Sequence, residues 1–292
     1  MNTHQKKIRK KPPWLKRRLP TGKAYEKVRR LLDKNCLHTV CQEAHCPNIW
    51  ECFSEGTATF LIMGDRCTRN CRFCAVAQGP SGPPDPEEPQ RIAEAVQTLN
   101  LSYVVVTSVT RDDLSDGGAG HFAATIKCIR ESKSDTRVEV LIPDFQGSET
   151  ALDLVLEAAP DVLNHNLETV KRLYPQVRPQ AIYERSLALM KYVYDHSSIP
   201  VKSGLMLGLG ESNEEVQNAL QDLFDSGCRL LTLGQYLQPS KAHLPVQEYI
   251  TPEEFASLRR KSLAMGFKEV ASAPFVRSSY HAQDLADTAS QI

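Results

Sequence analysis

Two groups of closely spaced cysteines are the residues in this chain whose types and spacing could do chemistry. The groups are Cys41-x₄-Cys46-x₅-Cys52 and, 14 residues further on, Cys67-x₃-Cys71-x₂-Cys74. Three thiolates can hold three irons of an iron–sulfur cube and leave the fourth iron open to another ligand. Two groups therefore predict two clusters, each with one corner that a ligand other than cysteine completes.

Cysteines can also form disulfides or bind zinc. A disulfide scaffold fits poorly, because nine is an odd number and because such scaffolds are typical of small secreted chains. A zinc site would need a fourth ligand, such as a histidine, beside the second group. No histidine follows Cys74 at the spacing of a zinc finger, so zinc stays the weaker alternative. The remaining cysteines, Cys36, Cys128 and Cys228, are left out of both ligand sets.

Composition indicates a globular protein in a reducing compartment. The chain has 292 residues, 41% of them hydrophobic, and a formal net charge of zero. No apolar run approaches the roughly 18–20 residues that cross a bilayer, and the N-terminus lacks the apolar core of a signal peptide. We therefore expect a cytoplasmic protein that does not bind membranes, with thiols that stay reduced. A monomer is the default expectation for its oligomeric state.

Basic residues are concentrated near the N-terminus, where the segment from Lys6 to Arg30 carries twelve Lys or Arg residues against Glu26 alone. The segment is predicted to become helical near Ala24–Asp33. It could be a solvated tail, or it could dock on an acidic carrier domain or an electron donor. Nucleic acid is the least favoured partner, because the arm has few aromatic residues for stacking on bases.

From residue 59 onward, strand and helix patterns alternate. The predicted strands are Thr59–Gly64, Tyr103–Val109, Val138–Pro143, Asp161–Asn166, Val201–Leu207 and Leu230–Tyr236. The predicted helices are Arg91–Leu99, His121–Ser132, Thr150–Ala158, Tyr183–Tyr194, Asn213–Asp225 and Pro252–Met265. The strands are rich in β-branched residues and do not alternate with polar ones, which is typical of a parallel sheet buried on both faces.

Such units close into a full or partial barrel or open into a doubly wound sheet, and the pattern alone does not choose between them. Either fold places its active site at the C-terminal ends of the strands. The second cysteine group directly follows the first predicted strand, so it falls at that end. Residues 36–56 show no clear periodicity and are expected to form an irregular lobe that holds the first group.

The second cysteine group resembles that of the radical S-adenosylmethionine superfamily, in which C-x₃-C-x-aromatic-C follows the first strand of a (β/α) barrel. Cys67, Cys71, Phe73 and Cys74 match this pattern. The resemblance implies a catalytic cluster whose open iron binds S-adenosylmethionine and splits it into methionine and a 5′-deoxyadenosyl radical. The strand-end sequence Gly204-Leu-Met-Leu-Gly208-Leu-Gly210-Glu211 is similar to a cofactor-contacting motif of the superfamily. A glycine-rich strand end is often needed only for packing, so this second signal is weak alone.

The first cysteine group is similar to the auxiliary-cluster motif of the lipoyl synthase family. Further segments match the family in order along nearly the whole chain, namely Pro12–Leu15, Gly56–Phe60, Thr107–Asp113, Gly117–Gly118, Asn164–Glu168, Gln176–Pro179, Gly234–Pro239 and Arg277–Tyr280. The resemblance implies that a serine of the Arg277–Tyr280 segment is the fourth ligand of the auxiliary cluster. By analogy with the family we assign Ser279 rather than Ser278, which the sequence does not separate from it.

The resemblance also implies the reaction. A radical sulfurtransferase of this family inserts sulfur at C6 and C8 of an octanoyl group on a protein lysine. It uses two S-adenosylmethionine molecules and two 4Fe–4S clusters, and the auxiliary cluster is the sulfur donor. Gly204, Gly208 and Glu211 would bind the cofactor with Phe73. The implied partners are octanoylated lipoyl carrier domains, either dehydrogenase E2 subunits or the glycine-cleavage H protein, and an electron donor such as flavodoxin or ferredoxin.

The resemblance selects the partial barrel. We expect an α/β protein with a partial (β/α)₆ TIM-type barrel over residues 57–266. An N-terminal basic arm and auxiliary-cluster extension would span 1–56, and a C-terminal extension with the serine motif would span 267–292. Two rivals remain at this point. One is a methylthiotransferase, which should carry an accessory domain, and the other is a zinc-stabilised binding module with a basic arm.

Overall fold

A computed structural model describes residues 11–16, 23–54, 58–79 and 82–290 of the chain. Much of the predicted basic arm, the predicted domain boundary after residue 56 and part of the loop that begins at Pro80 lie outside the described residues. Within them, no helix has both the length and the apolar character that crossing a bilayer requires.

One eight-stranded sheet organises the fold, with the strand order β1-β2-β5-β6-β7-β8-β9-β10. All neighbouring strands are parallel except β1, which is antiparallel to β2. The strands are β1 (His38–Thr39), β2 (Thr59–Ile62), β5 (Tyr103–Ser108), β6 (Arg137–Leu141), β7 (Val162–Asn164), β8 (Val201–Leu207), β9 (Leu230–Gln235) and β10 (Glu269–Ser272). A separate short pair, β3 (Arg66–Cys67) and β4 (Ala77–Gln78), holds the second cysteine group between its strands.

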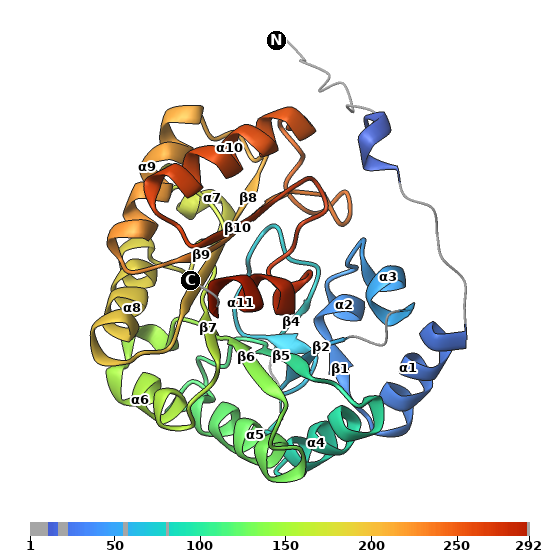
Figure 1. Cartoon of the computed structure of the whole chain (residues 1–292). Coiled ribbons are helices and arrows are strands. Elements are labelled where there is room, and N and C mark those ends of the chain that lie inside the picture. The colour runs from blue at the N-terminus through green and yellow to red at the C-terminus, as the bar shows by residue number, and fades with distance from the viewer. Residues whose placement is uncertain (1–10, 17–22, 55–57, 80–81, 291–292) are drawn as a thin grey trace.

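Helices cover the outer face of the curved sheet (Figure 1). The longer ones are α1 (Lys23–Lys34), α4 (Glu88–Leu99), α5 (Ala119–Ser132), α6 (Glu149–Glu157), α8 (Tyr183–His196), α9 (Asn213–Asp225) and α10 (Pro252–Met265). The last helix, α11 (Ala282–Ser290), lies instead inside the ring that these helices form in Figure 1. Shorter ones are α2 (Val40–Glu43), α3 (Ile49–Ser54) and α7 (Tyr174–Val177), with single turns at Pro13–Leu15, Phe145–Gly147 and Lys171–Leu173. The outer helices and inner parallel strands confirm the predicted partial (β/α) barrel.

Local sequence signals account for several helix ends. Ser212 and Glu215 form a capping box at the start of α9, and Thr251 and Glu254 form another at the start of α10. In each box the hydroxyl and the carboxylate satisfy backbone N–H groups that the first helical turn leaves without partners. Gly266 ends α10 in the left-handed region with φ +115°, where a residue with a Cβ is strained. These ends coincide with the predicted bounds of α9 and α10.

All six predicted strands are present, within three residues at either end, and β1 and β10 extend the sheet beyond them. Each addition comes from a predicted extension, since β1 precedes the first cysteine group and β10 follows the last barrel helix. Both strands are short, so their periodicity is too weak to be recognised in the sequence. The expected irregular lobe is more ordered than predicted, because α2 carries Cys41 and α3 carries Cys52.

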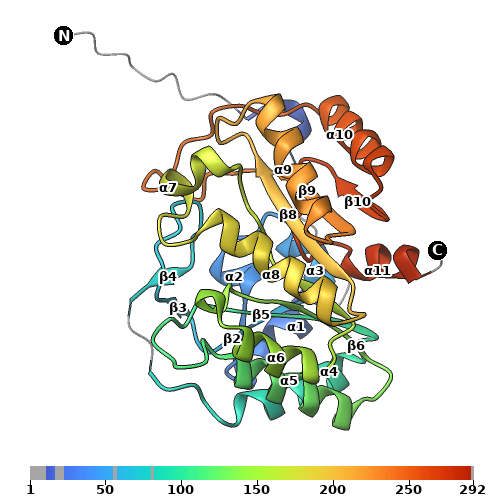
Figure 2. The same ribbon diagram turned by 90° about the vertical axis from the view of Figure 1, so that its left-hand side faces the viewer.

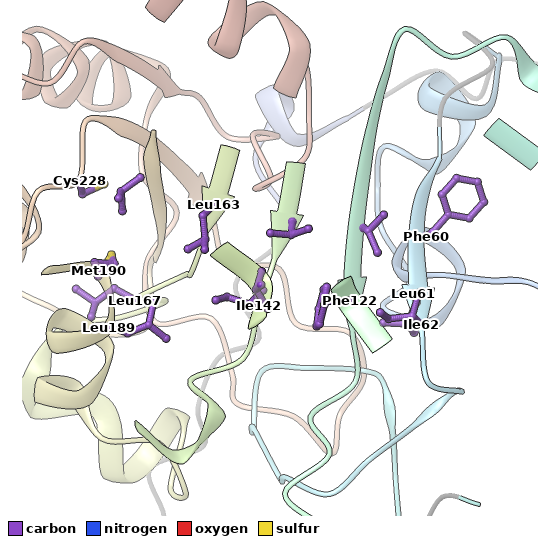
Figure 3. Close-up of a cluster of buried hydrophobic side chains, with 14 of the residues drawn as sticks. Phe60, Leu61, Ile62, Phe122, Ile142, Leu163, Leu167, Leu189, Met190 and Cys228 are labelled. Carbon is purple, nitrogen blue, oxygen red and sulfur yellow. The ribbon is translucent and has the colours of Figure 1, made fainter. Parts of the chain in front are cut away.

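The main hydrophobic core lies between the sheet and its helices. Figure 3 shows Phe60, Leu61 and Ile62 of β2 near Phe122 of α5, and Leu163 of β7 on the side that Leu189 and Met190 of α8 occupy. Burial of such side chains stabilises each by about 1.5–3 kcal/mol relative to exposure. Cys228, which precedes β9, is fully buried in this core, and Cys128 of α5 is half-buried.

A smaller core closes the end of the barrel where the strands begin. Ala282 and Ala286 of α11 are buried with apolar residues of β5, β7 and β9. The Asp287 carboxylate of α11 pairs with Arg137 at the start of β6. In Figure 2, α11 lies on the side of the barrel opposite to β3 and β4. The C-terminal helix therefore seals one end and leaves the other end for the site.

A buried ion pair occupies the interior of the barrel. Lys202 of β8 donates through Nζ to Oε1 and Oε2 of Glu139 of β6, at 2.8 and 3.0 Å. Both residues are fully buried. The Tyr103 hydroxyl and the Asn164 amide donate to the same carboxylate at 2.7 and 3.1 Å. Four strands thus share one carboxylate, which fixes their relative positions.

Removing one charge of this pair should destabilise the fold more than removing both. We expect Lys202→Met to lower the free energy of unfolding by about 3–5 kcal/mol, because it leaves the Glu139 carboxylate buried without its counter-ion. The double variant Glu139→Gln/Lys202→Met should lose much less. Urea unfolding of the metal-free protein measures both. A single variant no less stable than the double variant would contradict a structural role for the pair.

Candidate functional site

A cavity of about 490 Å³ opens at the C-terminal ends of the barrel strands. Its wall includes many residues that the sequence singled out, namely Cys41, Cys46, Cys67, Cys71, Phe73, Cys74, Gly204, Ser278 and Ser279. Segments more than 200 residues apart thus meet at one space. The predicted residues Cys52, Gly208 and Glu211 are outside this wall.

The second cysteine group is held in place by the loop that carries it. Cys67 ends β3, and its sulfur accepts backbone N–H bonds from Arg69 and Thr110 at 3.4 and 3.3 Å. The buried guanidinium of Arg69 binds both carboxylate oxygens of Asp112 at 2.6 and 2.9 Å, and Nη2 also reaches Asp144 at 2.5 Å. These bonds join the loop to the ends of β5 and β6, so the thiols keep a fixed position relative to the strands.

The cysteines of this group are half-buried. Burial raises the pKa of the Cys74 thiol to about 12, with further increases from the neighbouring Cys71 and Cys67. Burial also raises the pKa of Cys71, although the nearby Arg178 guanidinium opposes that increase. Thiolates at these positions therefore need added positive charge, which bound iron would supply.

On the other side of the cavity, Cys41 and Cys46 lie near the serine motif. Burial raises the pKa of the Cys41 thiol to about 12, and the charge of Cys46 adds to the effect. Thr59 forms hydrogen bonds with Cys41, and its hydroxyl also donates to Ser279 Oγ at 2.8 Å. Thr59 thus joins the first cysteine group to Ser279. Ser278 instead accepts a bond from Asn166 Nδ2 at 2.6 Å, so the two serines face different parts of the site.

The C-terminal tail is bound directly to the lobe of the first cysteine group. The buried Asn48 donates through Nδ2 to the Phe275 carbonyl at 2.7 Å, and the Tyr280 hydroxyl donates to Glu51 Oε1 at 2.7 Å. Cys52 is four residues after Asn48, and its N–H bonds to the Asn48 carbonyl. Residues spaced in this way share one helix face, so Cys52 is on the side of α3 that faces the tail.

Three buried polar atoms of the cavity wall have no hydrogen-bond partner among the described residues. They are Ser108 Oγ, Asn166 Oδ1 and Arg178 Nε. A buried polar atom left without a partner costs about 1–3 kcal/mol, so such atoms mark a place where a ligand binds. The half-buried Glu168 is close by and accepts a bond from Asn166 Nδ2 at 3.1 Å. Burial raises the pKa of Glu168, and Arg178 partly offsets the increase.

From the sequence alone, Ser108, Arg178 and Thr59 receive no role. A signal for each was present, because each lies in a segment that carries the resemblance: Thr107–Asp113, Gln176–Pro179 and Gly56–Phe60. Thr59 begins β2, where the sequence also predicts a buried strand residue. Its importance depends on the tail, whose position no local pattern indicates.

The glycine-rich end of β8 has two separate functions. A Cβ on Gly204 would lie 2.4 Å from Thr232 Oγ1 and 3.0 Å from Asn166 Oδ1, so glycine lets these two side chains of the cavity wall pack against β8. Gly208 has φ +98°, and a Cβ there would lie 2.3 Å from Gln235 Nε2. Glu211 accepts N–H bonds from Gly208 and Leu209 at 2.5 and 3.0 Å. Gly208 and Glu211 therefore shape the turn beside the cavity.

Other polar residues at the strand ends have structural partners. Arg111 pairs with Asp113 at 2.7 Å. Both ring nitrogens of the buried His165 are hydrogen-bonded, to the Ile142 carbonyl at 2.9 Å and to Ser186 Oγ at 3.0 Å. Burial lowers the His165 pKa to about 4, so the ring is neutral near pH 7. These contacts leave His165 without a free nitrogen for a metal.

The wall of the cavity includes the three thiols of the second cysteine group, those of Cys67, Cys71 and Cys74. Within the part of the chain that the structure describes, no three His, Cys, Asp or Glu side chains are arranged to hold one metal ion. In a cubane site, each of three cysteines binds a different iron.

Comparison with known proteins identifies related chains. Residues 61–223, more than half of the chain, match the Radical SAM superfamily, and residues 1–46 match the N-terminal domain of lipoyl synthase of the Radical SAM family. The lipoyl synthase of Caldicellulosiruptor saccharolyticus is 58% identical over 276 residues, covering 94% of this chain and 97% of the relative. That of Desulfotalea psychrophila is 56% identical over 276 residues, with coverages of 94% and 92%.

Solved structures share the fold at low sequence identity. Streptococcus suis SuiB bound to S-adenosylmethionine superposes with a TM-score of 0.55 and 13% identity, covering 75% of this chain and 51% of SuiB. HydG, a maturase of the FeFe hydrogenase, gives a TM-score of 0.55 and 16% identity, with coverages of 90% and 70%. At these identities the likeness supports the barrel fold alone.

The bond from Asn48 to the tail should keep the tail docked. We expect Asn48→Asp to speed proteolytic release of the segment after residue 274 by about tenfold, because a carboxylate would face the Phe275 carbonyl in place of a donor. Asn35→Asp is the matched control, since Asn35 donates to the Leu31 carbonyl within the α1 region. Limited proteolysis followed by mass spectrometry measures the rate. Equal release from both variants would contradict the docking role of Asn48.

Proposed function

The chain belongs to the lipoyl synthase family of the radical S-adenosylmethionine superfamily, and from this premise we propose that it inserts sulfur at C6 and C8 of an octanoyl group on a carrier lysine. The observation that carries the proposal is that both cysteine groups contribute to the wall of one cavity. An acyl chain in this cavity would be next to both groups. The family uses S-adenosylmethionine and a 4Fe–4S cluster, and its substrate is an octanoylated carrier protein.

Cys67, Cys71 and Cys74 are the proposed ligands of the radical-generating cluster, with Phe73 beside them. When bound, the cluster and S-adenosylmethionine supply a carbon radical that removes hydrogen from the acyl chain. The two N–H bonds to the Cys67 sulfur hold it in place. The loop fixed by Arg69 keeps the thiols oriented toward the cavity.

S-adenosylmethionine is proposed to lie against the ends of β5, β7 and β8. Ser108, Asn166 and Arg178 each offer a buried polar atom to it. The Arg178 guanidinium suits the carboxylate of the cofactor, and Glu168 suits its positive ammonium or sulfonium group. Gly204 lines the same cavity, next to Asn166, and would contact the cofactor through its backbone. Gly208 and Glu211 shape the turn beside the cavity. They would therefore affect cofactor binding through this turn and not by direct contact.

Cys41, Cys46, Cys52 and Ser279 are the proposed ligands of a second, auxiliary cluster, which is consumed as the sulfur source. The Thr59 bond supports Ser279 over Ser278, because Thr59 also contacts Cys41. Serine oxygen is a hard ligand among soft thiolates. We infer that the bond between Ser279 and its iron is the weakest ligand bond of this cluster. Breaking this bond would open the cluster for sulfur donation.

Each of the three proposed segments, 1–56, 57–266 and 267–292, would contribute to one part of the reaction. The barrel makes the radical, and the two extensions hold the auxiliary cluster and cover the cavity from the side. Cover of this kind excludes water from a reactive carbon radical. E2 subunits and the H protein are the proposed carriers, and flavodoxin or ferredoxin the proposed electron donor. A cytoplasmic location follows from the need to keep the cysteines reduced.

Anaerobic turnover tests the function directly. Iron–sulfur-replete protein with reductant, S-adenosylmethionine and an octanoyl-lysine peptide should give a peptide whose mass rises by two sulfurs less two hydrogens. Two 5′-deoxyadenosines should form for each product, because each carbon needs one hydrogen abstraction. Mass spectrometry and chromatography measure both quantities. A colourless protein with stoichiometric zinc, or 5′-deoxyadenosine without any sulfur in the peptide, would contradict the proposal.

Variants of the two serines separate their roles. We expect Ser279→Ala to lower sulfur insertion by at least about tenfold while 5′-deoxyadenosine still forms, because only the auxiliary cluster loses a ligand. Ser278→Ala removes a single hydrogen bond, which is worth about 0.5–1.5 kcal/mol, so it should retain more product. The reverse order of the two variants would assign the ligand to Ser278. Full turnover of Ser279→Cys with normal iron content would exclude the idea that a weak oxygen corner is needed.

A further inference from the structure

The loop of the second cysteine group has an outer side as well as the side that faces the cavity. A surface depression of about 590 Å³ lies against this outer side. Cys71 and Cys74 line both the depression and the cavity. The loop is therefore a partition, and the proposed radical-generating cluster would be separated from the surface only by its own ligands and their neighbours.

Hydrogen bonds join the two walls of the depression to each other. One wall is the loop itself with β4, and the other is the segment from Ala242 to Pro245, which follows β9. The Leu244 N–H donates to the Arg72 carbonyl at 3.2 Å, and His243 Nε2 bonds to the Cys74 carbonyl at 2.9 Å. In Figure 2, β4 and the loop after β9 lie on the same side of the barrel. A molecule bound here would touch residues bonded directly to the cluster loop.

The depression has a positive border. None of its lining residues is acidic, and Arg72 among them is exposed. The exposed Lys241 directly precedes the lining residue Ala242. The exposed Arg66 donates to the carbonyl of Gln78, which also lines the depression, at 3.4 Å. Three exposed cations, Arg66, Arg72 and Lys241, thus lie on or beside the lining of the depression.

The proposed function requires an electron at this cluster for each S-adenosylmethionine that is cleaved. Electron transfer weakens steeply with distance, so the donor must bind where the cluster is near the surface. On the cavity side, the cofactor and the acyl chain occupy the space in front of the cluster. Neither the cofactor nor the acyl chain would occupy the outer depression. A donor bound there could deliver an electron while the cavity stays closed to water.

We propose that this depression is the docking surface for an acidic one-electron carrier protein, with Arg66, Arg72 and Lys241 as its charged contacts. This inference rests on the proposed function. The carrier loses one electron on each visit, and the cluster gains it. Opposite charges speed the encounter and orient the partner, and salt weakens both effects.

Charge reversal on the rim of the depression, which Arg66, Arg72 and Lys241 form, tests the proposal. We expect Arg72→Glu and Lys241→Glu each to raise the KM for reduced flavodoxin by about tenfold or more at low salt, with the loss shrinking as salt is added. Arg260→Glu on α10 is the matched control, because Arg260 is exposed and α10 is on the other side of the barrel in Figure 2. Binding of oxidised flavodoxin, measured by calorimetry without turnover, should show the same order.

A small chemical reductant separates this proposal from the proposed function. Dithionite does not need a docking surface, so 5′-deoxyadenosine formation with dithionite should be the same for the rim variants, the control and the unchanged protein. Failure of the unchanged protein with dithionite would count against the proposed function itself. Unaltered flavodoxin binding and KM in both rim variants would overturn the docking surface. A raised KM for the octanoylated carrier in their place would assign the surface to the substrate. Lys241→Glu keeps the test valid if Arg72→Glu does not fold.

Discussion

Contact between the C-terminal tail and the lobe of the first cysteine group is the constraint on which the site depends. The sheet is a linear series of strands with β1 and β10 at its edges, so the strands alone do not enclose a site. The tail enters this gap. A Cβ on Gly234 would lie 2.1 Å from the Val276 carbonyl oxygen, so the close approach of the tail to β9 requires glycine. The contacts that seal the gap also bring Ser279 to Thr59. The same contacts therefore close the barrel and assemble the proposed auxiliary site.

Burial disfavours the charged form of both the thiols and the guanidinium around the cavity, but only the guanidinium has charged partners that offset it. Burial raises the pKa of Cys41 and Cys74, which favours neutral thiols when no metal is bound. The buried Arg69 keeps its charge because Asp112 and Asp144 bind it directly. The protein therefore fixes the loop with a permanent ion network and leaves the thiolate charge to be balanced by iron. Metal binding and formation of the thiolates are then coupled, as in other metal sites.

Much of the barrel is predictable from the sequence, because it depends on local patterns. Buried β-branched runs identify the six inner strands, and capping residues locate the ends of α9 and α10. The site is predictable only where a motif falls at a strand end, as with Cys67, Cys71, Cys74 and Gly204. Thr59 and Asn48 do not lie at the C-terminal end of a strand, and their roles come from contacts across the chain. Gly208 and Glu211 show the opposite case, in which a motif marks residues that support a turn beside the cavity.

A loop with two accessible sides solves a geometric problem of the proposed chemistry. The acyl chain, the cofactor and a cluster that donates sulfur must share one dry space, and a carbon radical in that space must not meet water. An electron, in contrast, has to come from a protein too large to enter. If both used the same opening, the cavity would have to open for every electron. Because Cys71 and Cys74 face both the cavity and the outer depression, the electron can cross the loop while the tail keeps the cavity covered. Arg69 holds that partition rigid, so the fold that excludes water also keeps the cluster near the surface.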